Sequence, residues 1–275
     1  FEKPIVQEED ANAVRRLNQF TGPFILRRMK SEVLRELPPK TENVRRVELE
    51  TEQRKLYLAA VVDAREKLRA AKPEDKMTVF AVLMRLREIC CDPRLVADNW
   101  TGSSAKLEAC LELVTEAVAG GHRILLFSQF TSMLELLAKR LDEAGVSHFT
   151  LQGSTPKPVR AEQVRRFNQG EADVFLISLR AGGTGLNLTA ADIVIHYDPW
   201  WNLAAQNQAT DRAYRIGQRN PVQVYRLIAQ DTIEEKIVEL QQAKQSLADT
   251  VTGGADGAIL SMNPEQLLQL LGEEA

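Results

Sequence analysis

The residues best suited to chemistry lie in the segment QATDRAYRIGQ, where Gln208, Asp211, Arg212 and Arg215 follow the spacing Q-x-x-D-R-x-x-R. If residues 201–213 are helical, Gln208, Arg212 and Arg215 share one face by the i, i+4, i+7 rule, and two guanidinium groups converge. Phosphoryl transfer spreads negative charge over oxygen atoms, and an arginine from outside the phosphate-binding loop can stabilise that charge. The alternative is a solvated helix with a surface ion pair between Asp211 and Arg215.

Apolar patterning predicts the framework that carries this segment. After about residue 101, short apolar runs alternate with helical stripes, which predicts a parallel sheet covered by helices on both faces. The expected strands are 124–127, 149–151, 174–178, 193–197 and 222–228. The expected helices are a stripe over 107–118, one opened by a capping box of Ser132 and Glu135 and closed by Gly145, and three near 158–168, 202–213 and 232–247.

The segments directly after these strands are polar or rich in glycine. They read SQFTS, QGSTP, LRAGGTG and DPWWN. Ligands of open parallel sheets bind beyond the C-terminal ends of the strands. The sequence therefore predicts a functional edge formed by these four loops.

Residues outside this sheet divide into three further parts. Residues 1–50 combine helical patterning with an extended linker after Leu37-Pro38-Pro39, because a residue before proline avoids the helical region. Residues 51–100 predict a small helical subdomain, broken at Pro73, and residues 101–250 form the α/β lobe. The acidic tail, residues 251–275, ends in a leucine-bearing helix from Asn263 or Pro264, which either docks elsewhere in a larger protein or packs as a terminal helix.

Composition limits the class of protein. Apolar residues are 44% and charged residues 27%, which is typical of a globular protein. The net charge of −3 argues against a general polyanion binder, so any basic surface is local. The apolar runs are too short for a membrane span, and three cysteines without a C-x-x-C motif fit a reducing cytoplasm, or a nucleus in a eukaryote.

Several long motifs in the right order resemble one family. Helicase superfamily 2 has Q-x-x-G-R-x-x-R as its sixth motif, and the R-I-G-Q ending is similar to that of its Swi/Snf branch. ILLFSQF resembles the fourth motif of that branch, SLRAGGTGLNLTAAD the fifth, and DPWWN the segment that follows it. PFILRRMKSEV and LPPKTE resemble its linker between lobes. The resemblance covers residues 23 to about 247, and Leu203 departs from it where many relatives have proline.

The resemblance implies the C-terminal, RecA-like lobe of an ATP-dependent double-stranded DNA translocase. Arg212 and Arg215 would be arginine fingers, with Gln208 positioning them and Asp211 orienting Arg212. They would act on ATP and magnesium held mainly by a first RecA-like lobe. A G-x-x-x-x-G-K-[ST] loop does not occur in this sequence, so we expect no ATP hydrolysis by this chain alone.

The strand-end loops supply candidates for nucleotide and DNA contacts. Gly183 and Gly185 would let the backbone approach the nucleotide and the DNA, although a simple glycine-rich turn is the alternative. The side chains suited to phosphate oxygens of the DNA backbone are Ser128, Gln129, Ser154, Thr155 and Arg180. Arg160, Arg165 and Arg166 add positive charge, with a solvated helix face as the alternative, and Trp200 and Trp201 are expected to pack the loop against the sheet.

Two other classes of function stay open at this point. One is a regulatory module that binds DNA or a partner without catalysis, and the other is the lobe of a strand-separating helicase. Metal-ligand spacing is absent among His122, His148, His196 and the cysteines, and neither G-x-S-x-G nor H-E-x-x-H occurs. The sequence therefore gives no support to a metalloenzyme or a serine hydrolase.

Overall fold

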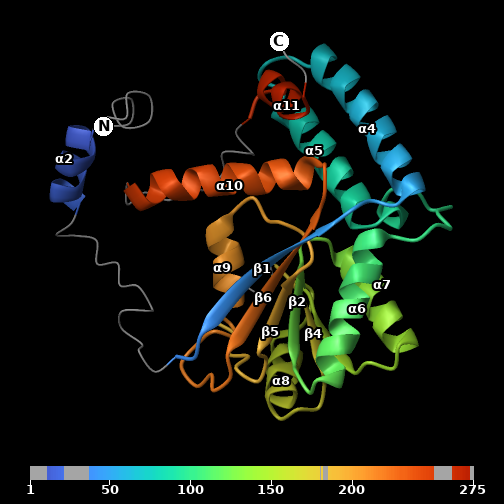
Figure 1. Cartoon of the computed structure of the whole chain (residues 1–275), viewed down its shortest axis with the longest axis vertical. Helices are drawn as coiled ribbons and strands as arrows, with labels where there is room; N and C mark the ends of the chain where they lie inside the picture. Colours follow the sequence, from blue (N-terminus) through green and yellow to red (C-terminus); the bar gives the residue numbers. More distant parts are fainter. Residues whose placement is uncertain (1–10, 22–36, 180, 182–184, 251–261, 273–275) are drawn as a thin grey trace.

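The structure is a computed structural model, and it describes residues 11–21, 37–179, 181, 185–250 and 262–272. Its centre is a six-stranded sheet of order β1-β6-β5-β2-β4-β3, in which every neighbouring pair is parallel (Figure 1). The strands are β1 (Lys40–Val47), β2 (Ile124–Ser128), β3 (His148–Leu151), β4 (Val174–Ser178), β5 (Ile193–His196) and β6 (Val222–Ala229). The parallel sheet predicted from the alternating pattern is confirmed.

Helices cover both faces of the sheet. Those described are α2 (Ala11–Thr21), α4 (Thr51–Ala70), α5 (Lys76–Cys91), α6 (Ala105–Ala119), α7 (Thr131–Glu143), α8 (Lys157–Asn168), α9 (Leu203–Thr210), α10 (Ile233–Thr250) and α11 (Pro264–Leu270), with a short 3-10 turn at Pro93–Leu95. None of these helices is long and apolar enough to cross a membrane.

Alternate residues of β2 supply the cores on the two faces. Leu126 packs with Leu107 of α6 and Leu134 of α7 on one side. Phe127 packs with Phe167 of α8 on the other side, in a cluster that also contains Ala209 of α9. Every residue of β2 and β4 is buried, because helices cover both faces of the central strands.

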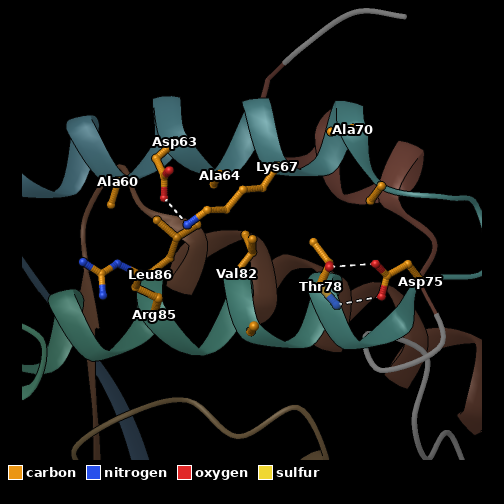
Figure 2. A pocket seen from close by; sticks show the side chains of 12 residues that line it. Ala60, Asp63, Ala64, Lys67, Ala70, Asp75, Thr78, Val82, Arg85 and Leu86 are labelled. Atoms are coloured by element: carbon orange, nitrogen blue, oxygen red, sulfur yellow. Dashed lines mark hydrogen bonds and ion pairs between the residues drawn. The ribbon is translucent and has the colours of Figure 1, made fainter.

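A helical hairpin of α4 and α5 stands at the C-terminal edge of the sheet (Figure 1). The two helices share a third core with the starts of α10 and α11, which includes Leu68, Leu83 and Ile233. The expected break at Pro73 is present, and Asp75 caps α5 by accepting the N–H of Thr78 at 3.0 Å. Figure 2 shows this cap beside a groove of about 490 Å³ between α4 and α5, which is lined by small side chains and by an ion pair within α4.

Two local expectations differ from the structure. Residues 40–47 are extended, as expected, but they form the edge strand β1 paired with β6 instead of a free linker. Sequence patterning could not reveal this, because the strand is mostly exposed and its partner lies about 180 residues later. The capping box of Ser132 and Glu135 is wrong, since α7 begins at Thr131 after Phe130 and has no side-chain cap. Gly145 does end α7, with φ of 68°.

The C-terminal tail ends in a packed helix. α11 begins at Pro264 as expected, and Asn263 forms a reciprocal capping box with Gln266. Leu267 is buried in the third core, and Arg65 of α4 donates to the carbonyl of Leu271 at 2.6 Å. Of the two alternatives for this helix, the structure shows packing on the hairpin. The helical patterning of residues 1–36 is described only over α2, and the rest of that range lies outside the described residues.

Candidate functional site

The arginine motif lies in a turn that follows α9. The helix ends at Thr210, and beyond it the N–H of Arg212 donates to the carbonyl of Ala209 at 3.1 Å, which is the tighter i to i−3 spacing. The helix expected near 202–213 is present but ends three residues early, so the expected helical face shared by Gln208, Arg212 and Arg215 is wrong. The physical reason is tertiary, because the carbonyl of Arg212 accepts the N–H of Leu188 at 3.0 Å from the loop after β4.

The two arginines of the motif place their charges close together. Arg212 is only 7% exposed, whereas Arg215 is exposed. Burial lowers the pKa of Arg212, the positive charge of Arg215 lowers it further, and the charge of Asp211 opposes both effects. A guanidinium in such surroundings gains most from a nearby anion. Gln208 is exposed near the end of α9, about one helical turn before Arg212.

A buried glutamine holds this arginine turn against the sheet. The side-chain amide of Gln218 donates to the carbonyl of Ala191 at 2.7 Å and to that of Ala213 at 3.2 Å. Its oxygen accepts the N–H groups of Arg219 and Asn220 at 2.8 and 2.9 Å. Sequence reasoning identified this residue only as the end of R-I-G-Q, and the structure shows that it anchors the turn.

The strand-end loops meet α5 across a groove of about 970 Å³. Gln129 from the loop after β2 and Ser154 from the loop after β3 line it together with Phe80 of α5 and with Trp200 and Trp201. The structure therefore brings two of the predicted DNA contacts to one surface. Their contact with DNA stays a prediction.

Two other predicted contacts have hydrogen-bond partners within the protein. Thr155 accepts the N–H of Gln152 on its hydroxyl at 3.0 Å and thereby holds the turn after β3. Ser128 is fully buried, so its hydroxyl is not accessible for the direct phosphate contact that was expected of it. Its hydroxyl donates to Asp198 at 2.5 Å instead. The reason is that Ser128 is the last residue of a strand covered on both faces.

Asp198 is the centre of a buried network that the sequence analysis missed. Besides Ser128, its carboxylate accepts the N–H of Gln129 at 3.2 Å and pairs with Arg87 of α5 at 3.3 Å. Burial raises the pKa of Asp198, while the charge of Arg87 and the hydrogen bond from Ser128 lower it. The available sequence signal for this network was an aspartate after the apolar run at β5. No sequence signal pointed to its partner on α5, Arg87.

Comparison with known proteins gives the family. A model of the SNF2-related domain matches residues 1–95, and a model of the helicase conserved C-terminal domain matches residues 105–217. The chain belongs to the Swi/Snf family. Its relatives include an uncharacterized ATP-dependent helicase of Mycoplasma pneumoniae, which is 38% identical over 98% of this chain and 26% of the relative. A mouse SWI/SNF-related regulator of chromatin, subfamily A member 1, is 37% identical over 88% of this chain and 24% of its own length.

Solved Swi/Snf structures share the RecA-like fold of this chain. The Sulfolobus solfataricus SWI2/SNF2 ATPase core in complex with double-stranded DNA has a TM-score of 0.72 and 30% identity, over 98% of this chain and 58% of that one. The C-terminal domain of the same ATPase has a TM-score of 0.70 and 27% identity, over 86% of this chain and all of that one. This Swi/Snf chain spans about a quarter of the length of the curated relatives it matches.

The glycine-rich loop of this Swi/Snf chain is only partly described. Gly185 has φ of 24°, which favours glycine, and among the described residues, its chain neighbours aside, no atom lies within 4 Å of the position that a Cβ would take. The close approach of nucleotide or DNA to this backbone stays a prediction. Gly183 and Arg180 lie outside the described residues.

The remaining candidates have structural partners. On α8, Arg165 pairs with Glu162 at 2.5 Å and Arg166 pairs with Glu171 at 2.7 Å, which is the solvated helix face that was the alternative. Trp200 packs on the core beneath α8 and α9, as expected for a loop packed on the sheet. Over the described part of the chain, no group of three His, Cys, Asp or Glu side chains could hold a metal ion.

Proposed function

We propose that this chain is the second ATPase lobe of a Swi/Snf-type double-stranded DNA translocase, and that Arg212 and Arg215 are its arginine fingers. The observation that carries the proposal is the turn after α9, which holds Arg215 near the buried Arg212, so that its positive charge lowers the pKa of Arg212. Two guanidiniums close together suit the charge that develops in phosphoryl transfer.

In this proposal the chain completes a site whose other half lies on a first RecA-like lobe. That lobe would hold ATP and magnesium, and the metal would neutralise charge on the phosphates. Closure of the lobes would bring Arg212 and Arg215 onto the nucleotide. Gln208 would contact the nucleotide from the exposed end of α9, Asp211 would orient Arg212, and Gly183 and Gly185 would let the backbone approach closely.

The DNA would lie along the groove between α5 and the strand-end loops. Gln129, Ser154 and Arg180 would contact backbone phosphates, while Thr155 shapes the turn beside them. Such contacts fix position without reading the base sequence, so we expect little sequence preference. Reopening of the lobes would shift this grip along the duplex. The likeness to an ATPase core bound to double-stranded DNA supports this proposal.

The test is the Arg212→Ala variant of the protein that carries this chain. We expect the DNA-stimulated ATPase rate to fall by about 10³-fold or more, because an arginine finger contributes about that much in related phosphoryl transfer. The matched control is Arg219→Ala, which removes an exposed arginine just after the same turn. Unchanged turnover in Arg212→Ala would show that this arginine is not a finger.

The two other classes of function predict different results. A non-catalytic module would show no ATPase activity in the wild-type protein under any condition. A strand-separating helicase would be stimulated more strongly by single-stranded DNA than by duplex. We expect duplex DNA to be the better stimulant.

A further inference from the structure

Arg87 of α5 is a fully buried arginine to which the proposed activity assigns no role. Its Nη2 donates to the carbonyl of Pro199 at 2.5 Å and lies 3.3 Å from Oδ2 of Asp198. Its guanidinium lies 4.1 Å from the ring centre of Trp201 and 5.5 Å from that of Phe130. One side chain of the hairpin therefore contacts the loops after both β5 and β2.

The carboxylate that Arg87 holds is also the one that shapes the loop after β2. Asp198 accepts the N–H of Gln129 with both oxygens, at 3.2 and 3.3 Å, and accepts the hydroxyl of Ser128. Gln129 lines the groove from this loop, and Phe80 lines it from the same α5 that carries Arg87. The pair of Arg87 and Asp198 thus connects α5, which lines one side of the groove, to the Gln129 loop, which lines the other.

Stability alone is a poor reason for this arrangement. A buried ion pair is often no better than apolar side chains of the same volume, because both charges lose their water. The Nε and Nη1 atoms of Arg87 have no hydrogen-bond partner among the described residues, which adds to this cost. What the pair provides and an apolar contact would not is a fixed direction for the carboxylate.

We infer that Arg87 is a positioning residue, which through Asp198 sets the Gln129 loop against α5 so that the groove fits the backbone of duplex DNA. This inference rests on the proposed function, because that function assigns the groove to DNA. Arg87 itself contacts no DNA in this view. Its effect reaches the ligand only through the carboxylate of Asp198.

The test compares Arg87→Lys with the wild type, in the protein that carries this chain. Lysine keeps the charge but loses the planar group that bridges Asp198, Pro199 and Trp201. We expect the duplex concentration for half-maximal ATPase stimulation to rise by about tenfold, since small displacements of binding groups have effects of this size or larger. Maximal turnover at saturating duplex should fall much less.

Two conservative variants serve as controls. Arg85→Lys changes an exposed arginine on the same helix. Lys106→Arg perturbs a second fully buried ion pair, with Glu234, whose two opposite charges act on Asp198 in opposite directions and which forms no hydrogen bond with Asp198 or Gln129 among the described residues. Neither control should change the duplex concentration required, even if Lys106→Arg lowers the melting temperature as much as Arg87→Lys does.

Amide hydrogen exchange separates failure of this inference from failure of the proposed function. The Gln129 amide should exchange faster in Arg87→Lys than in the wild type or in either control, because its acceptor is displaced. If the wild type is stimulated by duplex and Arg87→Lys matches it in duplex requirement or in Gln129 exchange, the inference is overturned alone. If duplex does not stimulate the wild type, the proposed function is overturned, and the role of Arg87 in DNA binding falls with it.

Discussion

Two buried arginines at different edges of the sheet have opposite surroundings, since Arg87 lies beside the ends of the strands and the turn of Arg212 is held by residues before β5. Arg87 faces the carboxylate of Asp198, a backbone carbonyl and two aromatic rings. Arg212 has the positive charge of Arg215 beside it, and both that charge and burial lower its pKa. The first guanidinium faces a carboxylate, whereas the second lies beside another cation. The same residue type is therefore structural at one edge of the sheet and a candidate for catalysis at the other.

The sharpest way to break this contrast is to remove Arg215. Because its side chain is exposed, Arg215→Ala should leave the free energy of unfolding within about 0.5 kcal/mol of the wild type. DNA-stimulated ATP turnover in the protein that carries this chain should nevertheless fall by about 10³-fold or more. Urea unfolding and steady-state ATPase rates measure the two effects. A large loss of stability with little loss of turnover would reverse the roles assigned to the two arginines.

Removing Arg87 should, in contrast, strongly lower the free energy of unfolding. Arg87→Met leaves the buried Asp198 carboxylate without its cation, which typically lowers the free energy of unfolding by about 3–5 kcal/mol. Arg85→Met, on the exposed side of the same helix, should change it by less than about 0.5 kcal/mol. Urea denaturation of both variants tests this. Equal stability of the two would mean that the buried pair is not needed for folding.

The anchor of the arginine turn should have an intermediate effect. Gln218→Ala leaves four backbone groups without their buried partner, so we expect a loss of about 1–3 kcal/mol in the free energy of unfolding. Gln208→Ala, on the exposed end of α9, should be nearly neutral in the same measurement. A neutral Gln218→Ala would show that the turn is held by its other contacts.

The smallest effect on stability is expected at Glu42 of the edge strand β1, which is partly exposed and pairs with Lys40 and Arg226. Burial raises the pKa of Glu42, but the Lys40 hydrogen bond and the charges of Arg226 and Lys40 outweigh it, so the pKa lies below its usual 4.5. Because the folded-state pKa is depressed, Glu42 stabilises the protein above pH 4.5, and this contribution disappears as the pH falls through the folded-state pKa. Glu42→Gln should therefore cost at most about 1 kcal/mol at pH 7 and less at pH 3. Unfolding curves at the two pH values measure this, and an equal cost at both would rule out an ionic contribution.

Much of the fold could be read from local pattern. The runs of β2 and β4 are apolar throughout because both faces are covered, and the break near Pro73 and the turn at Gly145 follow from backbone restrictions of those residues. β1 escaped prediction as a strand because its pairing with β6 depends on residues far away in the chain. α9 ends earlier than expected. The carbonyl of Arg212, which a longer helix would have used, accepts the N–H of Leu188 instead.

The candidate site divides in the same way. Motif order and spacing identified Arg212, Arg215, Gln129 and the four strand-end loops, since these depend on residue types close together in the chain. Sequence gave no means to see that Ser128 faces inward, or that Arg87 reaches Asp198 over more than 100 positions. Both depend on how the hairpin packs against the end of the sheet.

The sequence by itself determined the family, the parallel α/β architecture and the residue types available for phosphate chemistry, because periodicity and motif spacing are local properties. The tertiary structure decided which of those side chains are exposed and which are paired. Burial and partner charge depend on elements that meet only after folding. That is why two arginines that look alike in the sequence have different roles. Arg212 is a candidate arginine finger, and Arg87 is buried in an ion pair with Asp198.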